Sequence, residues 1–196
     1  MEKELSDMTL EELWELFPII LEDHNADYKK WYAEEKQNIE KTIGKEAIER
    51  ISHIGSSAVT GLVSKPTIDI LLEIESQTEI KKVERLLIEA GWLLMSSMET
   101  PHLNYVFNKG YTKKGFAEKV YHLHIRCLGD WSEPYFRDYL IDHEKVAKEY
   151  GKLKLKLGKT YKNDRSGYTN AKTEFVEYYT EKARIEYGSK YKIDRI

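Results

Sequence analysis

The feature that most constrains the fold is the segment 67–74, TIDILLEI, which is rich in β-branched and aliphatic residues and interrupted only by two acids. This composition favours a β-strand and makes the segment the strongest strand candidate in the chain. Asp69 lies inside it, and a carboxylate is costly to bury without a partner. We therefore expect Asp69 to face a cleft, or else to pair with Lys65 or an arginine.

The spacing of apolar residues changes twice along the chain. Before residue 44 the apolar spacing is mostly helical. A capping box of Thr9 and Glu12 begins a short helix, a short apolar strand follows, and a second helix comes after it. Strand patterns then dominate to about residue 130, where they stop. We predict strands at 17–21, 50–54, 67–74, 92–95, 105–107 and 119–127, and helices at 26–43 and 80–90. The C-terminal part is predicted to be helical. Its first helix begins near Ser132, a long basic helix follows, and Asn170 caps the last helix.

This order of elements predicts an α+β protein with a single domain spanning residues 1–196. The sheet core covers about 17–130, and a helical C-terminal segment, about 131–188, packs on it. A chain of 196 residues is long enough to bury one sizeable hydrophobic core.

Charge and composition exclude several classes of protein. The chain has 31 basic and 34 acidic residues, a net charge of −3, so we do not expect a nucleic-acid-binding protein with its basic face. The single cysteine, Cys127, rules out a disulfide framework. No apolar run approaches the ~20 residues that span a bilayer, and the N-terminus lacks the apolar region of a secretory signal. We expect a cytoplasmic protein with no membrane partner.

The segment 53–73, HIGSSAVTGLVSKPTIDILLE, carries the residues that suggest chemistry. A strand ends at a turn formed by Gly55 and Ser56, a short helical turn follows, and the next strand brings Asp69. A glycine there lets the backbone approach a ligand closely. Serine hydroxyls and amides at such a turn bind phosphate oxygens, and an aspartate nearby can hold a divalent metal that bridges them. This is the logic of phosphoryl and nucleotidyl transfer; the plainer reading is a turn with a serine cap.

Other residues, both inside and outside this segment, are further candidates for the same site. Ser57 belongs to the turn, and Lys65 and His53 flank it as candidate phosphate contacts. His122 and His124 lie on one face of the alternating strand 119–127, which we expect beside the strand of Asp69. With Asp69 they would form a ligand set for a transition metal, or one of them would act as a base. The alternative is a pair of half-buried, hydrogen-bonded histidines.

The sequence HIGSSAVTGLVSKPTIDI resembles the signature of the GrpB-like family, within the broader motif of the nucleotidyltransferase superfamily. The later blocks YHLHIRC, FRDYLIDH, EYGKLK and YTNAKTEFV are also similar to that family's pattern, so the resemblance runs from about Trp31 to about Tyr179. It implies a nucleotidyltransferase-like fold, a mixed β-sheet flanked by helices. Some members are fused to a coenzyme A biosynthesis kinase, which makes such a kinase a candidate partner.

The chain departs from active transferases of that superfamily at Leu71, where a second carboxylate usually stands. Glu73 lies on the same face of the strand as Asp69, but at ~3.3 Å per residue the two backbones are about 13 Å apart. We therefore expect no two-metal site from this strand alone, and we read Glu73 as a rim or surface residue.

The C-terminal blocks add basic residues. Arg137, Lys154 and Lys172 are candidates for anion contacts, or for salt bridges across a helical interface. The lysines between 145 and 159, Lys154 among them, are most simply the solvated face of a helix.

Three functions follow from these residues. The first is binding of a nucleotide or other phosphorylated small molecule, with Mg²⁺, Mn²⁺ or Zn²⁺ as a candidate cofactor and nucleotidyl transfer as the reaction. The second is a non-catalytic ligand-binding or scaffold module of the same fold, which Leu71 favours. The third and weakest is a metal-dependent hydrolase built on Asp69, His122 and His124.

Overall fold

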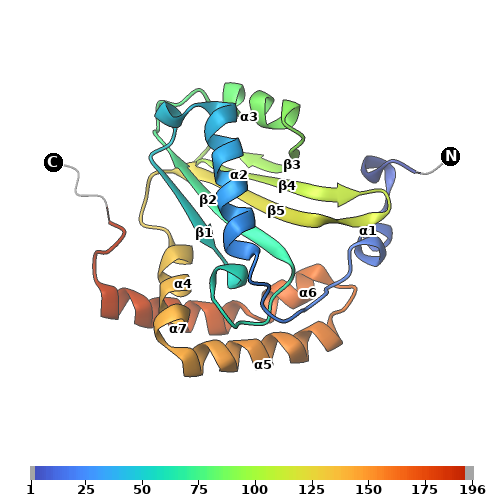
Figure 1. The fold of residues 1–196 in the computed structure, drawn as a ribbon, viewed down its shortest axis with the longest axis vertical. Coiled ribbons are helices and arrows are strands. Elements are labelled where there is room, and N and C mark those ends of the chain that lie inside the picture. The colour runs from blue at the N-terminus through green and yellow to red at the C-terminus, as the bar shows by residue number, and fades with distance from the viewer. Residues whose placement is uncertain (1–2, 193–196) are drawn as a thin grey trace.

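Five strands form one mixed sheet in the order β1-β2-β5-β4-β3, with helices on both faces (Figure 1). The structure is a computed structural model and describes residues 3–192. The α+β class with a mixed, helix-flanked sheet is confirmed. The strands are β1 (Arg50–Ile54), β2 (Thr67–Ile74), β3 (Leu93–Met98), β4 (Asn104–Thr112) and β5 (Gly115–Cys127).

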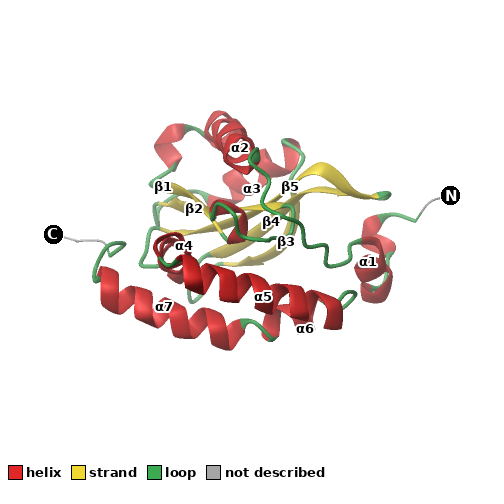
Figure 2. Ribbon diagram, turned by 60° about the horizontal axis from the view of Figure 1, so that its bottom comes forward, coloured by secondary structure: helices red, strands yellow, loops and turns green. Residues whose placement is uncertain are grey.

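The helices make two layers around the sheet (Figure 2). Helices α2 and α3 cover one face, the C-terminal helices α4 to α7 cover the other, and α1 lies beside the end of the β4–β5 hairpin. Single turns of 3-10 helix, η1 to η3, occur at Leu5–Asp7, Lys45–Ala47 and Ser56–Ala58. The α-helices are α1 (Leu10–Leu16), α2 (Tyr28–Ile43), α3 (Ile80–Glu89), α4 (Ser132–Asp142), α5 (Glu144–Thr160), α6 (Arg165–Asn170) and α7 (Thr173–Tyr187).

Strand β2 lies inside the sheet, where it pairs antiparallel with β1 and parallel with β5. Alternate residues of a strand point to opposite faces. The even-numbered residues of β2 therefore join the main core under α2 and α3, while Asp69, Leu71 and Glu73 face the C-terminal helices. The register sets Asp69 opposite His122 and Leu71 opposite His124. The expected placement of the histidine strand beside the aspartate strand is thus confirmed.

Two apolar clusters hold the layers together. The larger one joins β2, β4 and β5 to α2 and α3. The smaller one fixes the C-terminal helices to the segment after η3, with the side chains of Val59, Leu62, Phe136, Leu140, Ala147 and Tyr150. The second cluster brings the loop between β1 and β2 against α4 and α5.

Most predicted elements are confirmed, and two are wrong. The capping box of Thr9 and Glu12 forms, and the strands at 50–54 and 67–74 have the predicted bounds. The strand expected at 17–21 is absent: the amide of Ile19 donates to the Lys162 carbonyl at 2.7 Å, so this segment lies along the end of α5. Asn170 ends α6 and does not cap the last helix.

Candidate functional site

Asp69 and His122 are in direct contact at the centre of the site. Asp69 Oδ1 is 3.0 Å from His122 Nδ1. The other ring nitrogen, Nε2, lies 2.8 Å from the Tyr111 hydroxyl and 3.1 Å from Arg165 Nη2. A guanidinium can only donate, so Nε2 accepts and Nδ1–H donates to Asp69. Parallel pairing of β2 and β5 produces this contact, because it sets the two residues side by side.

The protonation states follow from the surroundings. Burial lowers the pKa of His122, although its hydrogen bond to Asp69 opposes this, and we assign the ring as neutral. Burial would raise the pKa of the Asp69 carboxyl, but the hydrogen bond from His122 and the charge of Lys65 outweigh it and hold that pKa below its usual range. The Asp69 side chain is 29% exposed, so a charged carboxylate remains accessible at the surface of the sheet.

Four basic side chains lie close enough to interact electrostatically with this carboxylate or with one another: Lys65, Lys154, Arg165 and Lys172, which we call the cationic cluster. Lys65 precedes β2, Lys154 and Arg165 come from α5 and α6, and Lys172 lies between α6 and α7. Their charges act on one another or on Asp69. Within residues 3–192, none of the four forms an ion pair with a carboxylate.

The cluster carries uncompensated positive charge. Burial and the charges of Arg165 and Lys172 lower the pKa of Lys65 to about 7, against the pull of Asp69. Burial and the charge of Lys172 lower the pKa of Lys154 to about 7, and burial also lowers that of Lys172. The cluster therefore combines four basic groups with one nearby carboxylate, an excess of positive charge that would attract an anion.

Local contacts hold the lysines in place. Lys154 is only 2% exposed; its Nζ donates to the Val63 carbonyl and lies 4.7 Å from the centre of the Tyr150 ring. Lys172 Nζ lies 4.3 Å from the ring centre of Tyr168. The expectation that Lys154 belongs to a solvated helix face is therefore wrong.

The turn after β1 lies against the same carboxylate. Gly55 has φ +71°, and a β-carbon on it would overlap Asp69 Oδ2. The backbone at Gly55 therefore closely approaches the Asp69 side chain, whereas from the sequence we expected it to approach a ligand. Ser56 lies beside the Tyr150 hydroxyl. His53 Nε2 is 3.1 Å from Ser57 Oγ. These contacts fix the turn and bring Asp69, Ser56 and α5 together.

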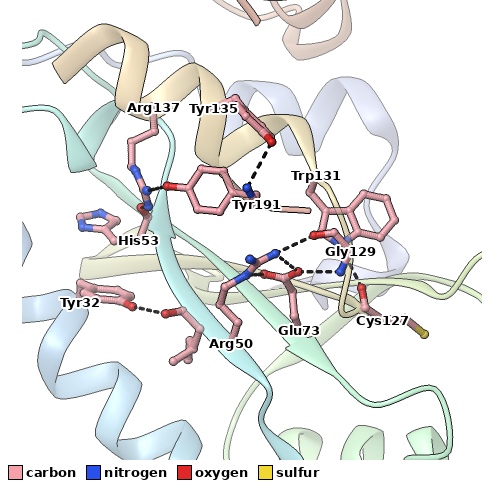
Figure 3. A network of polar contacts seen from close by, with 11 residues as sticks. Tyr32, Arg50, His53, Glu73, Cys127, Gly129, Trp131, Tyr135, Arg137 and Tyr191 are labelled. Atoms are coloured by element: carbon pink, nitrogen blue, oxygen red, sulfur yellow. Dashed lines mark hydrogen bonds and ion pairs between the residues drawn. The ribbon is translucent and has the colours of Figure 1, made fainter. Parts of the chain in front are cut away.

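His53 itself lies on the other side of the sheet. Its ring stacks on Tyr32 of α2 with centroids 4.7 Å apart, and burial lowers its pKa to about 4. Figure 3 shows His53 beside Arg137. Arg137 donates to the His53 carbonyl at 2.9 Å and to the Tyr191 hydroxyl at 2.8 Å, so it connects α4 to β1 and lies outside the cationic cluster.

Glu73 has a structural role. It is fully buried and paired with Arg50, whose Nη2 lies 2.6 Å from Oε1, and the amide of Gly129 donates to the same oxygen at 3.1 Å (Figure 3). The prediction of a rim or surface position is wrong, because β1 and the loop after β5 supply every partner that the carboxylate needs.

The expected metal set does not assemble. Among the residues that the structure describes, no three His, Cys, Asp or Glu side chains are close enough together to hold a metal ion. His124 lies opposite Leu71 in the register, and the guanidinium of Arg165 approaches the Nε2 of His122. A centre built from Asp69, His122 and His124 alone does not fit this geometry.

A cavity of about 840 Å³ adjoins the site. Its floor is the sheet face of β4 and β5, its walls are α1, β3 and α6, and His122 and Arg165 lie on its inner side. Arg165 and Asn108 are functional candidates that sequence reasoning missed. No spacing signal connects either of them to Asp69, because the contacts depend on how the sheet and C-terminal helices pack.

Comparison with known proteins identifies the family. A family model described as "GrpB protein" matches residues 18–182. The glutamate-rich protein GrpB of Alkalihalophilus pseudofirmus is 38% identical over an alignment of 164 residues that covers 81% of this chain and 92% of that protein. The UPF0157 protein YqkA of Bacillus subtilis is 27% identical over 82% of this chain and 46% of its own length.

A solved structure agrees with this. The crystal structure of conserved protein GrpB from Enterococcus faecalis matches with a TM-score of 0.73 at 26% identity, over 86% of this chain and 99% of that one. None of the described helices combines the length and apolar character needed to cross a membrane. The family model and the relatives cover the segment in which the site lies, and the chain belongs to the GrpB family.

Proposed function

We propose that this chain binds a phosphorylated small molecule, and specifically a nucleotide, with its phosphates in the cationic cluster. The observation that carries the proposal is the set of four basic side chains around the single carboxylate of Asp69. Neighbouring positive charges raise the free energy of the empty site, and those of Arg165 and Lys172 lower the pKa of Lys65. A phosphate group relieves that repulsion and accepts charge-assisted hydrogen bonds from the same side chains.

The Asp69–His122 pair has a positioning role in this proposal. The charged carboxylate fixes the His122 ring through Nδ1–H, and the ring in turn accepts from Arg165. Arg165 Nη2 also donates to the Tyr111 hydroxyl at 3.0 Å. Arg165 is thereby held toward the site, and among residues 3–192 its Nε and Nη1 have no partner, so they can donate to an anion.

A divalent ion is a separate proposal. Mg²⁺ or Mn²⁺ is commonly held by one or two carboxylates together with substrate phosphates, and Asp69 is the carboxylate at the cluster that offers this. Zn²⁺ would need three protein ligands, which the described residues do not supply. Nucleotidyl transfer is the second candidate function, supported by the ionised Asp69, whereas Leu71 favours a module that binds without turnover. A hydrolase built on the Asp–His set is the least supported, and a kinase partner is proposed from family resemblance alone.

Thermal melting tests the binding site directly. Tripolyphosphate and ATP are added to the full chain in EDTA, and then with Mg²⁺, Mn²⁺ or Zn²⁺ in its place. A ligand at 100 times its Kd stabilises the native state by about 2.7 kcal/mol, which raises Tm by about 8 °C for a chain of this size. We expect that shift in EDTA with both ligands. No shift with either ligand under any condition would contradict the proposal.

Two lysines of α5 provide a matched pair of variants. Lys154→Met removes one buried charge of the cluster, and we expect about tenfold weaker binding of tripolyphosphate, which halves the Tm shift at the same concentration. Lys152→Met changes an exposed lysine of the same helix and should leave the shift intact. Equal effects of the two substitutions would exclude the cluster as the binding site.

Asp69→Asn separates binding from catalysis. Extra stabilisation by Mg²⁺ or Mn²⁺ that disappears in this variant, together with turnover of a nucleoside triphosphate, would support transfer. Stabilisation that needs no metal, with no turnover of any triphosphate, would support the non-catalytic module.

A further inference from the structure

The cavity of about 840 Å³ beside His122 has a size typical of small-molecule sites. Its walls are mainly apolar: Leu10 and Trp14 come from α1, and Leu93 and Met95 come from β3. Leu10, Leu93 and Met95 are 55%, 44% and 57% exposed. Apolar side chains thus face one another across an open space, and a bound apolar surface would remove them from water.

One polar group at the floor of this cavity has no partner. Asn108 of β4 lies beside His122 in the register and is only 5% exposed. Its side-chain amide makes no hydrogen bond within the described residues, yet its atoms remain accessible and line the cavity. An amide carries both donors and an acceptor, and leaving it unpaired in an apolar site is costly. The cavity therefore offers a donor–acceptor pair to whatever fills it.

We propose that the cavity binds the base of the nucleotide whose phosphates lie in the cationic cluster. The Asn108 amide hydrogen-bonds the edge of the base, and the apolar walls, Trp14 among them, cover its faces. This inference rests on the proposed function above. A planar heterocycle fits because it presents adjacent donors and acceptors to an amide and apolar faces to the walls. An aliphatic chain of similar volume would leave the Asn108 amide unpaired.

The cavity and the cationic cluster meet at two side chains. Arg165 and His122 both line the cavity. Arg165 also acts on the charges of Lys65 and Lys172, and His122 contacts Asp69. A ligand with its base over Asn108 therefore has its phosphates directed past these two side chains toward the cluster.

Calorimetric titration of the full chain separates the two halves. The probes are tripolyphosphate, the four common ribonucleoside triphosphates and the corresponding nucleosides. We expect at least one triphosphate to bind tenfold or more tightly than tripolyphosphate. Asn108→Leu, which keeps the size and removes the amide, should weaken that triphosphate about tenfold and leave tripolyphosphate unchanged.

A second variant covers the case in which Asn108→Leu fails to fold, as judged by circular dichroism. Trp14 belongs to α1, which has no buried residue, so Trp14→Ala leaves the core intact. This variant should also weaken binding of the triphosphate and leave binding of tripolyphosphate unchanged. Glu11→Ala on the same helix is the matched control. If the triphosphates bind no more tightly than tripolyphosphate, the proposed base site in the cavity is wrong, while the proposed phosphate site in the cationic cluster still stands. If tripolyphosphate does not bind, the proposed function fails, and nucleoside binding that is sensitive to Asn108→Leu would still support the cavity. Absence of binding by every probe would overturn both.

Discussion

Asp69 and Glu73 lie four residues apart on the same face of β2, and their partners give them different roles. Glu73 is fully buried and satisfied by Arg50 and by the amide of Gly129. Asp69 is 29% exposed and pairs with a neutral histidine, so its charge acts on the basic groups around it. We infer that Glu73 serves stability and Asp69 serves binding.

Replacement of Glu73 tests this division. Glu73→Gln leaves the half-buried Arg50 guanidinium without its counter-charge, and we expect a loss of about 3 kcal/mol in the free energy of unfolding. Urea denaturation measures it, with the exposed Glu75→Gln as control. Tripolyphosphate affinity should stay unchanged. A tenfold loss of affinity without loss of stability would reverse the assignment.

The lysines of the cluster predict a pH dependence. Lys65 and Lys154 have folded-state pKa values of about 7, against an ordinary value of 10.5. Between these values the native state binds fewer protons than the unfolded chain, so the anion-free protein should become more stable as pH rises from about 7 to about 10. Binding has the opposite sign, because an anion favours protonated lysines.

Sulfate, whose charge is constant over this range, is a suitable probe. Its affinity should be highest below pH 7 and should fall as pH rises through about 7, with proton uptake on binding near that pH. Titrations in two buffers of different ionisation enthalpy measure the proton uptake. A sulfate affinity that is the same at pH 6 and pH 9 would contradict the placement of sulfate in the cluster.

At the scale of elements, the turn between β1 and η3 is the most constrained part of the site. Gly55 has φ +71° and touches Asp69, whereas Gly61 has φ +77° and no atom within 4 Å of the position of an added β-carbon. Both glycines are needed for backbone conformation, but only Gly55 is needed for the close approach.

These two glycines make a matched pair. Gly61→Ala should lose only the conformational cost, about 1 kcal/mol, while Gly55→Ala should lose about 2 to 3 kcal/mol because its methyl group displaces the Asp69 carboxylate. Gly55→Ala should also weaken tripolyphosphate binding, since Asp69 holds His122 and His122 holds Arg165. Urea denaturation and calorimetry give both quantities. Equal losses in the two variants would show that the contact between Gly55 and Asp69 contributes nothing to the free energy of unfolding.

The elements that the sequence predicts well are those with a local signal. TIDILLEI and the capping box at Thr9 depend on neighbours in the chain, and the pairing of Asp69 with His122 follows from two strand faces. The segment 17–21 fails because its partner, Lys162, is far away in sequence. Lys154 lies four residues after Tyr150, on the apolar stripe of α5, and that spacing predicts its burial. No comparable signal exists for Arg165.

At the scale of the whole molecule, the site joins two distant parts of the chain. Asp69 and Lys65 belong to the sheet half, whereas Lys154, Arg165 and Lys172 belong to the C-terminal helices. An anion that bridges them should therefore stabilise both halves together. The net charge of −3 makes the cluster a local exception on an acidic protein, which favours small anions over nucleic acids.

Hydrogen exchange measures this coupling. Saturating tripolyphosphate should slow amide exchange in β2, α5 and α6 together, because opening any of them requires release of the anion. Helix α3, on the opposite face of the sheet, serves as internal reference and should change less. Protection confined to the C-terminal helices would show that the anion does not reach Asp69.

Leu71 bears on how the sequence of this chain could change over evolutionary time. The side chain is fully buried between Asp69 and Glu73, opposite His124. An acid introduced at this position would be buried away from water and two residues from the ionised Asp69. Both its burial and its repulsion from Asp69 would destabilise the native state. A second carboxylate on this strand would therefore first require looser packing of the helices that cover this face. That change would lower the stability of the fold, which selection has to preserve.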